Sequence, residues 1–144
     1  MVARDLLEND PMEERLRFAQ FVNTQLPDGH CRIRIELTHP DRGVHTGQCE
    51  GLGSDTGVLR CSAQACVDAL SGAVSGVLSF ELLGVKAVKA FDATVIIVAL
   101  LVDGETTPRR IVGSCLTEDD PPRAAALAVL NATNRLLGNK LFMR

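Results

Sequence analysis

Apolar and polar residues alternate strictly over residues 31–37. One face of this segment carries three aliphatic residues and a cysteine, and the other carries two arginines and a glutamate. Such alternation is typical of a strand with one buried face. The apolar set is Cys31, Ile33, Ile35 and Leu37. A turn at residues 39–43 follows, and we expect the returning strand at residues 44–52, although its glycines weaken that prediction.

Helical spacing of apolar residues occurs in three other segments. The first starts at Asn9-Asp10-Pro11, where a cap precedes a proline at the first helical position, and we predict an N-terminal helix over residues 9–26. The second follows the capping residues Ser54-Asp55-Thr56 and runs to residue 75. The third begins at Pro121-Pro122 and ends at Gly138.

The most apolar segment, residues 93–102, predicts a strand because it contains four consecutive β-branched residues. Asp103-Gly104 after it is a strong hairpin signal, and the partner strand would be residues 108–116. A further strand is predicted at residues 77–85. We expect the hairpin from 93 to 116 at the centre of the sheet. Since the 93–102 strand is apolar on both faces, its second face requires a cover, either the N-terminal helix or a second subunit.

The order strand, turn, strand, acidic cap and Ala-rich helix occurs twice. A shift of 63 residues places Ile33 on Ile96 and Ala65 on Ala128, although any two hairpin-plus-helix units would align loosely. The pattern predicts an α+β fold with two ββα or βββα units around a pseudo-two-fold axis, with antiparallel sheet packed against helices. The units would span residues 31–75 and 77–138 of a single domain, residues 1–144.

Composition narrows the function classes. Apolar residues make up 46% and charged residues 23%, as in globular chains. With no Trp or Tyr and only five Phe, the scarcity of aromatic side chains counts against binding of single-stranded nucleic acid, and a net charge of −3 gives no general attraction to phosphates. No segment resembles a membrane span or a signal peptide, so we expect a cytoplasmic protein without membrane contact. The odd number of cysteines, five, fits reduced thiols in the core.

No set of catalytic residues is recognisable. The sequence has no Ser/His/Asp or Cys/His set, phosphate loop or dinucleotide motif, so we predict no enzyme activity and no cofactor. Three histidines and two cysteines between residues 30 and 49 suggest zinc, but their spacing matches no common zinc scaffold, and we predict no metal site. Cys61 and Cys66 are five positions apart on a helix and diverge, so they are not a redox pair.

The junction between the 108–116 strand and the last helix is the candidate ligand site. A helix start offers backbone N–H donors and the positive end of the dipole to a carboxylate. Hydroxyls add donors and two aspartates could hold an ammonium, so a zwitterion suits the junction. The candidate ligand-binding residues are Gly113, Ser114, Thr117, Asp119 and Asp120. The acidic cluster Glu118-Asp119-Asp120 could be a metal or catalytic site, but its position before Pro121-Pro122 favours capping of the helix.

Two further polar sets leave alternatives open. Asn131 and Asn134 share a face of the last helix and could bond a ligand or a second subunit. Four basic residues near the predicted sheet form either a basic rim or an ordinary solvated face. They are Lys86, Lys89, Arg109 and Arg110.

Three segments of the second half resemble a known family. They are Ala90-Phe91-Asp92-Ala93-Thr94-Val95, residues 112–120, and residues 129–137 at the end of the last helix, which are similar to an Asn-Ala-Leu-Asn-Arg-Leu ending. On these residues the chain resembles, over about residues 31–138, the C-terminal regulatory and dimerisation domain of α-isopropylmalate synthase. The resemblance implies two βββα units around a pseudo-two-fold axis, a homodimer, and binding of a small amino-acid-like effector.

The chain also departs from that family. Its predicted N-terminal helix stands where the family has a strand, and its first half matches the family's first helix poorly. The catalytic barrel and the metal-binding His-x-His pattern are absent from the sequence, so synthase activity is not implied. We expect a stand-alone regulatory-type module that dimerises and binds an amino-acid-like or keto-acid effector. The alternative is a module like the double-stranded-RNA-binding domains, which share its element order, although the acidic balance counts against nucleic acid.

Overall fold

The computed structural model describes residues 16–74, 78–104 and 107–142. Within these ranges, strands and helices follow in the order βββα, βββα. The first unit comprises β1 (Arg17–Gln25), β2 (His30–His39), β3 (Gly43–Leu52) and α2 (Asp55–Ala73). The second comprises β4 (Ser79–Ala90), β5 (Ala93–Asp103), β6 (Arg109–Thr117) and α3 (Pro121–Phe142). The predicted α+β class with two repeated units is confirmed.

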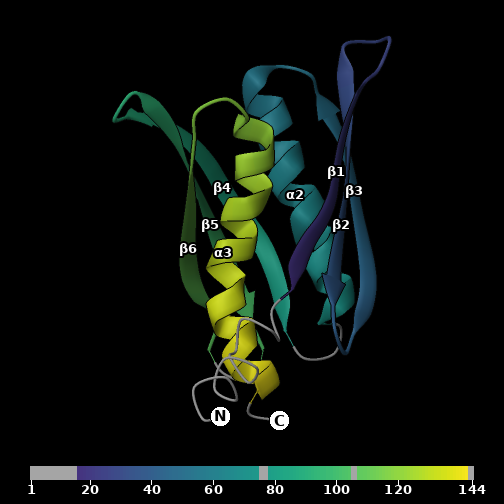
Figure 1. Ribbon diagram of the computed structural model, residues 1–144, viewed down its shortest axis with the longest axis vertical. Coiled ribbons are helices and arrows are strands. Elements are labelled where there is room, and N and C mark those ends of the chain that lie inside the picture. Colours follow the sequence, from purple (N-terminus) through teal and green to yellow (C-terminus); the bar gives the residue numbers. More distant parts are fainter. Residues whose placement is uncertain (1–15, 75–77, 105–106, 143–144) are drawn as a thin grey trace, which may run out of the picture.

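Each unit contributes one antiparallel sheet of three strands, with orders β1-β2-β3 and β4-β5-β6. The two sheets form the outer layers and the two helices lie between them (Figure 1). The predicted hairpin of residues 93–116 is therefore central only through β5, because β6 is an edge strand. The predicted strand at residues 77–85 extends to Ala90 as β4.

The predicted N-terminal helix over residues 9–26 is wrong for residues 17–25, which form β1; residues 9–15 lie outside the described part of the chain. The helix prediction counted Ala19 and Val22 on the apolar side, but both are exposed on β1, and a bulge between Phe18 and Gln20 alters the spacing of the core-facing residues. Phe18 pairs with Leu37 and Phe21 with Ile35, so two core-facing residues of β1 are three positions apart instead of two. A bulge thus gave a strand the i, i+3 spacing that is typical of a helix.

The same irregularity occurs in the second unit. The register of β4 shifts between Leu82 and Gly84, opposite Leu100 and Ala99 of β5. These β5 residues lie 63 positions after Leu37 and Glu36, the residues opposite the bulge of β1. Both first strands therefore bend at the same place, which supports the repeat inferred from the sequence.

Each helix packs on its own sheet at a glycine of the third strand. A Cβ on Gly47 would collide with the backbone of Ala65 and Ala69 in α2, and a Cβ on Gly113 with Ala128 and Ala132 in α3. The helix partners are related by the 63-residue shift. The small residues of α3 therefore let it lie close to its sheet.

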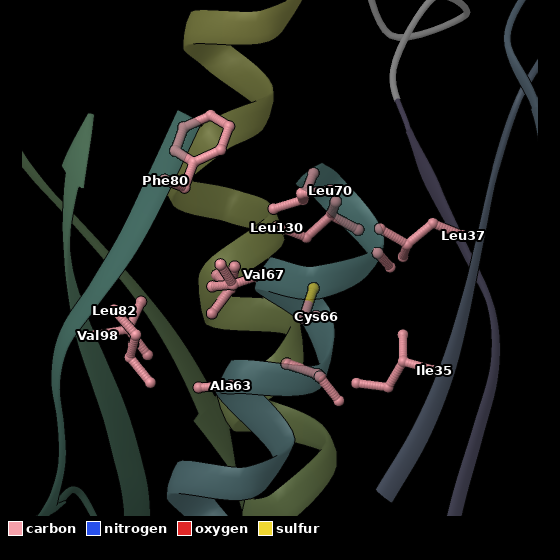
Figure 2. Close-up of a cluster of buried hydrophobic side chains, with 14 of the residues drawn as sticks. Ile35, Leu37, Ala63, Cys66, Val67, Leu70, Phe80, Leu82, Val98 and Leu130 are labelled. Atoms are coloured by element: carbon pink, nitrogen blue, oxygen red, sulfur yellow. The ribbon is translucent and has the colours of Figure 1, made fainter. Parts of the chain in front are cut away.

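The core is aliphatic and lies where α2 passes between the sheets. Figure 2 shows Ile35 and Leu37 of the first sheet on one side of α2, and Leu82 and Val98 of the second sheet on the other. Most sides of α2 are buried, with an exposed stripe that includes Arg60, Asp68 and Ser71, and Leu70 is fully buried. Burial of this apolar surface is the main stabilising term of the fold.

The outer faces of the two sheets differ in polarity. On the first sheet, Arg32 forms an ion pair with Glu50 (Nε to Oε2, 2.8 Å) and Arg34 donates to the Gln20 side chain (3.0 Å). On the second sheet, the outward register positions are mostly apolar. The apolar residues there are Val88, Val95, Ile97, Ala99, Leu101, Val112 and Leu116. We call this surface the outer face of β4-β5-β6.

Candidate functional site

A cavity of about 460 Å³ lies at the end of the molecule where both helices begin. Figure 1 shows α2 and α3 starting at the same end, between the two sheets. The wall is built by five elements and the turn before α2. Its residues are Asn23 and Gln25 of β1, Gly53, Asp55, Val58 and Leu59 around the start of α2, Ala87 and Lys89 of β4, Thr94 of β5, and Pro121 and Pro122 of α3. The cavity is therefore shared by the two units, and its volume suits a small metabolite.

The start of α2 is held in place by short-range contacts. The Ser54 side chain accepts from the N–H of Gly57 at 3.2 Å, and the Ser54 carbonyl accepts from the N–H of Val58 at 2.8 Å. Gly53 donates to the carbonyl of Gly29 at 2.9 Å, which ties this turn to the β1–β2 hairpin. These bonds leave the N–H groups of Asp55 and Thr56 without an acceptor in the helix, at the positive end of its dipole.

The wall combines two opposite charges with an apolar surface. Lys89 brings an ammonium from β4, and Asp55 brings a carboxylate from α2. Among the described residues, the ion pairs found involve neither of them. The amides of Asn23 and Gln25 add neutral donors and acceptors, while valine, leucine, alanine and proline side chains supply the rest. The arrangement suits a small zwitterion with an apolar side chain.

The predicted ligand site at the β6–α3 junction adjoins this cavity, but its polar groups act as a helix cap. Thr117 Oγ1 accepts from the N–H of Asp120 at 2.9 Å. Asp120 Oδ1 accepts from the N–H of Arg123 at 3.2 Å, and its carbonyl accepts from Ala124 at 3.1 Å. Pro121 and Pro122 have no N–H groups. This helix start therefore keeps few backbone donors for a carboxylate, which favours the capping role that the sequence left open.

The other residues of the predicted site do not face one common space. Gly113 lies under α3, where Ala128 and Ala132 fill the space beside it. Ser114 pairs with Ile97 on the outer face of β4-β5-β6, and Asp119 is exposed in the turn before α3. Only the neighbours of the junction reach the cavity: the two prolines, and Thr94, which pairs with Thr117.

Both asparagines of α3 bond the protein's own backbone. Asn131 Nδ2 donates to the Ser114 carbonyl at 3.0 Å, and Asn134 Nδ2 donates to the Leu16 carbonyl at 3.3 Å. The Asn134 bond joins α3 to the segment before β1. Neither residue lines the cavity. Asn131 thus holds α3 against β6, and Asn134 holds it against the residue before β1.

The four basic residues do not form one rim. Lys89 lines the cavity, whereas Lys86 and Arg110 occupy outward positions beside Ile97 and Leu101. Arg109 follows the β5–β6 turn, at the opposite end of β6 from Thr117. A surface for duplex RNA needs such charges on one side, and these four do not provide it.

Among the described residues, no group of three His, Cys, Asp or Glu side chains is placed to hold a metal ion, the histidines and cysteines between residues 30 and 49 included. His30 Nδ1 lies 3.2 Å from Asp28, whose carboxyl pKa is lowered chiefly by the hydrogen bond from the His30 N–H. His39 Nδ1 accepts from the N–H of Asp41 at 3.0 Å, and His45 Nε2 lies 2.6 Å from the Arg42 carbonyl. Each ring is engaged with its own turn or strand end.

The cavity residues escaped sequence reasoning for different reasons. Asn23 and Gln25 fell in the mispredicted helix, and Asp55 was interpreted only as a capping residue. Lys89 was noted only for its charge. Because β1, α2 and β4 converge only in the folded chain, no local pattern could have joined these residues.

No family model matches the chain, and no curated protein matches it. Among the described residues, no helix is both long enough and apolar enough to cross a membrane.

Proposed function

We propose that the protein is a regulatory-type module that forms a homodimer and binds a small amino-acid-like effector in the cavity at the helix starts. The observation that carries the proposal is the cavity itself, shared by both units and lined by one ammonium, one carboxylate and an apolar wall. An α-amino acid presents the complementary groups: a carboxylate for Lys89 and the start of α2, an ammonium for Asp55, and a side chain for Val58 and Leu59.

The position of the cavity supports a regulatory role. Its wall comes from β1 and α2 of the first unit and from β4, β5 and α3 of the second. A ligand that fits this space binds the arrangement in which the two units are correctly placed. It therefore stabilises that arrangement against any other. A partner that contacts both units would then sense the ligand.

The topology supports the family resemblance on which this proposal also rests. The resemblance implies two βββα units, and both units here have that order. The predicted N-terminal helix was one departure from the family, and a strand, β1, occupies that place.

The outer face of β4-β5-β6 supports the homodimer. The 63-residue shift relates Ile97 to Arg34, so corresponding positions are apolar on one sheet and charged on the other. Val112 and Leu116 are 60% and 59% exposed on this face, which is unfavourable in water. Glu81, Lys86 and Arg110 occupy outward positions of the same face, so a second copy related by a two-fold axis can oppose charges of unlike sign.

A thermal-shift screen of the protein amino acids and their 2-keto acids tests the ligand directly. We expect saturable stabilisation by leucine, and a smaller effect of glycine, which leaves the apolar wall empty. A ligand at a hundred times its Kd adds about 2.7 kcal/mol to the free energy of unfolding. If no amino acid or keto acid raises the Tm of the full chain, the proposal is wrong.

A further inference from the structure

Three cysteines of the first unit meet where β2, β3 and α2 come together. Cys49 Sγ lies 3.2 Å from Cys61 Sγ, within the contact distance of two thiols. Cys31 pairs with Gly51 beside them, and its thiol contacts the Leu52 carbonyl at 3.6 Å. Cys31 and Cys61 are buried, whereas Cys49 is partly exposed. All three are reduced.

We propose that Cys49 and Cys61 form a reversible intramolecular disulfide when the protein meets a peroxide. The strand residue and the helix residue already face each other, and closing the bond requires the sulfurs to approach by about 1 Å to reach the disulfide length. Cys61 and Cys66 are the cysteines of α2, but they diverge on the helix and therefore cannot form a disulfide with each other. The spacing of the cysteines along the sequence did not indicate that Cys49 of β3 contacts Cys61 of α2.

The exposures of the two thiols assign the order of the reaction. Cys49 is the group that a peroxide reaches from solvent. Its thiolate attacks one peroxide oxygen, the O–O bond breaks, and the sulfur becomes a sulfenic acid while hydroxide leaves. Cys61 then attacks the Cys49 sulfur, the S–O bond breaks, and water leaves with the Cys61 proton. Two thiols and one hydrogen peroxide thus give one disulfide and two waters. A dithiol reductant reverses the step by exchange.

Burial, followed by the neighbouring Cys49, raises the pKa of Cys61 above the ordinary thiol range. Cys61 therefore stays protonated and is protected from direct oxidation. It can still react with a sulfenic acid held against it. This contrast between an accessible first thiol and a protected second thiol is what a resolving pair needs.

Cys115 of the second unit occupies the position that corresponds to Cys49 of the first, but it has no partner thiol on its helix. Cys115 pairs with Ile96 as Cys49 pairs with Ile33, and it is also partly exposed. Each of these two thiols contacts the carbonyl of the next residue, at 3.8 Å for Cys49 and 3.7 Å for Cys115. However, the helix residue that the 63-residue shift relates to Cys61 is Ala124. Cys115 packs against the cluster that contains Ala124, so its counterpart thiol is missing.

The disulfide would link the two sides of the β3–α2 connection. Gly53 lies in this connection, Asp55 is the first residue of α2, and both line the cavity. Cys49 precedes this connection on β3 and Cys61 follows it on α2. If the proposed effector site is correct, oxidation changes effector affinity through this connection. The formation of the bond itself does not depend on that proposal, so the two can fail separately.

The test is oxidation of the full chain by hydrogen peroxide, followed by alkylation of the remaining thiols, intact mass and peptide mapping. We expect a loss of two hydrogens, a Cys49–Cys61 crosslinked peptide, and full reversal by dithiothreitol. Cys49→Ser and Cys61→Ser should abolish the crosslink, and Cys115→Ser should leave it unchanged. Thermal unfolding of the oxidised form should show a higher Tm, since a crosslink restricts the unfolded chain.

Ala124→Cys extends the test to the second unit. It supplies Cys115 with the missing partner, so this variant should gain a second intramolecular disulfide. The proposal fails if Cys49 and Cys115 of the wild type are oxidised alike, both ending as sulfinic acids or in intermolecular bonds. It also fails if Cys49 stays reduced at peroxide doses that oxidise Cys115.

Discussion

Asp55 and Lys89 carry opposite charges on the wall of one cavity, and each is predicted to bind one end of a zwitterion. Asp55→Asn should weaken leucine binding more than binding of 4-methyl-2-oxopentanoate, because the keto acid has no ammonium. Charge-assisted hydrogen bonds are worth about 1.5–3 kcal/mol, so the loss for leucine should be about tenfold or more. Isothermal titration of both ligands against both proteins measures the difference.

Asp119→Asn is the matched control. Asp119 is also an exposed acid beside a helix start, but it does not line the cavity. We expect unchanged affinity for both ligands. If Asp119→Asn selectively lost leucine binding while Asp55→Asn kept the wild-type affinity for leucine, the ligand site would be assigned to the β6–α3 junction.

Asp120 acts as a cap of α3 through its side chain and its carbonyl. Asp120→Ala removes the acceptor for the Arg123 N–H and should lower the free energy of unfolding by about 1 kcal/mol. Urea unfolding monitored by circular dichroism checks the value. Glu118→Ala, two residues before the cap and exposed, should have little effect. Equal effects of the two substitutions would contradict the cap assignment.

At the scale of elements, the contact of each helix with its sheet depends on a glycine. Gly47→Ala and Gly113→Ala place a methyl group against the backbone of α2 and α3, respectively. Each should lower the free energy of unfolding by about 1–3 kcal/mol, the usual cost of overpacking a core. Urea unfolding of the two variants gives these values.

Gly84→Ala is the control for the glycine variants, because this β4 glycine has open space where the methyl group would go. Its stability should stay close to that of the wild type. If Gly113→Ala were as stable as Gly84→Ala, the close packing of α3 on β6 would be contradicted.

Strands and helices whose apolar residues keep a single spacing from end to end could be predicted from the sequence. Strand β2 alternates without interruption and β5 is β-branched, and the predicted ends of both lie within two residues of the observed ends. Strand β1 was missed because its bulge shifts the alternation by one residue between Phe18 and Phe21. A single-residue bulge has no signature in a short apolar pattern, since either period fits two aromatic residues three apart.

At the scale of the whole molecule, the asymmetry of the two outer faces predicts the oligomer. Ile97 is half-buried on the outer face of β4-β5-β6, so Ile97→Asp should leave the monomer folded while preventing dimer formation. An unpaired carboxylate in an apolar interface is strongly unfavourable. Sedimentation velocity should show a dimer for the wild type and a monomer for the variant, with circular dichroism confirming the fold.

Arg34→Asp changes the corresponding position of the first sheet, which faces solvent. This variant should remain a dimer. A wild-type monomer, or a dimer that survives Ile97→Asp, would show that this face does not pair with a second copy. The sequence indicated that the 93–102 strand needs a cover on both faces, but it could not distinguish a helix from a second subunit.

The candidate site could be predicted only in its chemistry. The sequence suggested a zwitterion at a helix start, and the cavity has opposite charges near the start of α2. The cavity does not coincide with the predicted junction: the start of α3 has two prolines and a closed cap, whereas the start of α2 faces β4 of the other unit. Whether a helix start lines a cavity depends on how the two units pack against each other, and this packing is a property of the whole fold.

Amide chemical-shift mapping of the full chain with leucine tests the central claim most directly, because it locates the ligand without any substitution. We predict concerted shifts in both units at once: at Gly53 and Asp55 before and in the first turn of α2, and at Lys89 and Thr94 in β4 and β5. Residues of the opposite ends of the helices should stay unchanged. Shifts confined to residues 113–119, or no shifts at saturating leucine, would contradict a ligand cavity shared by the two units.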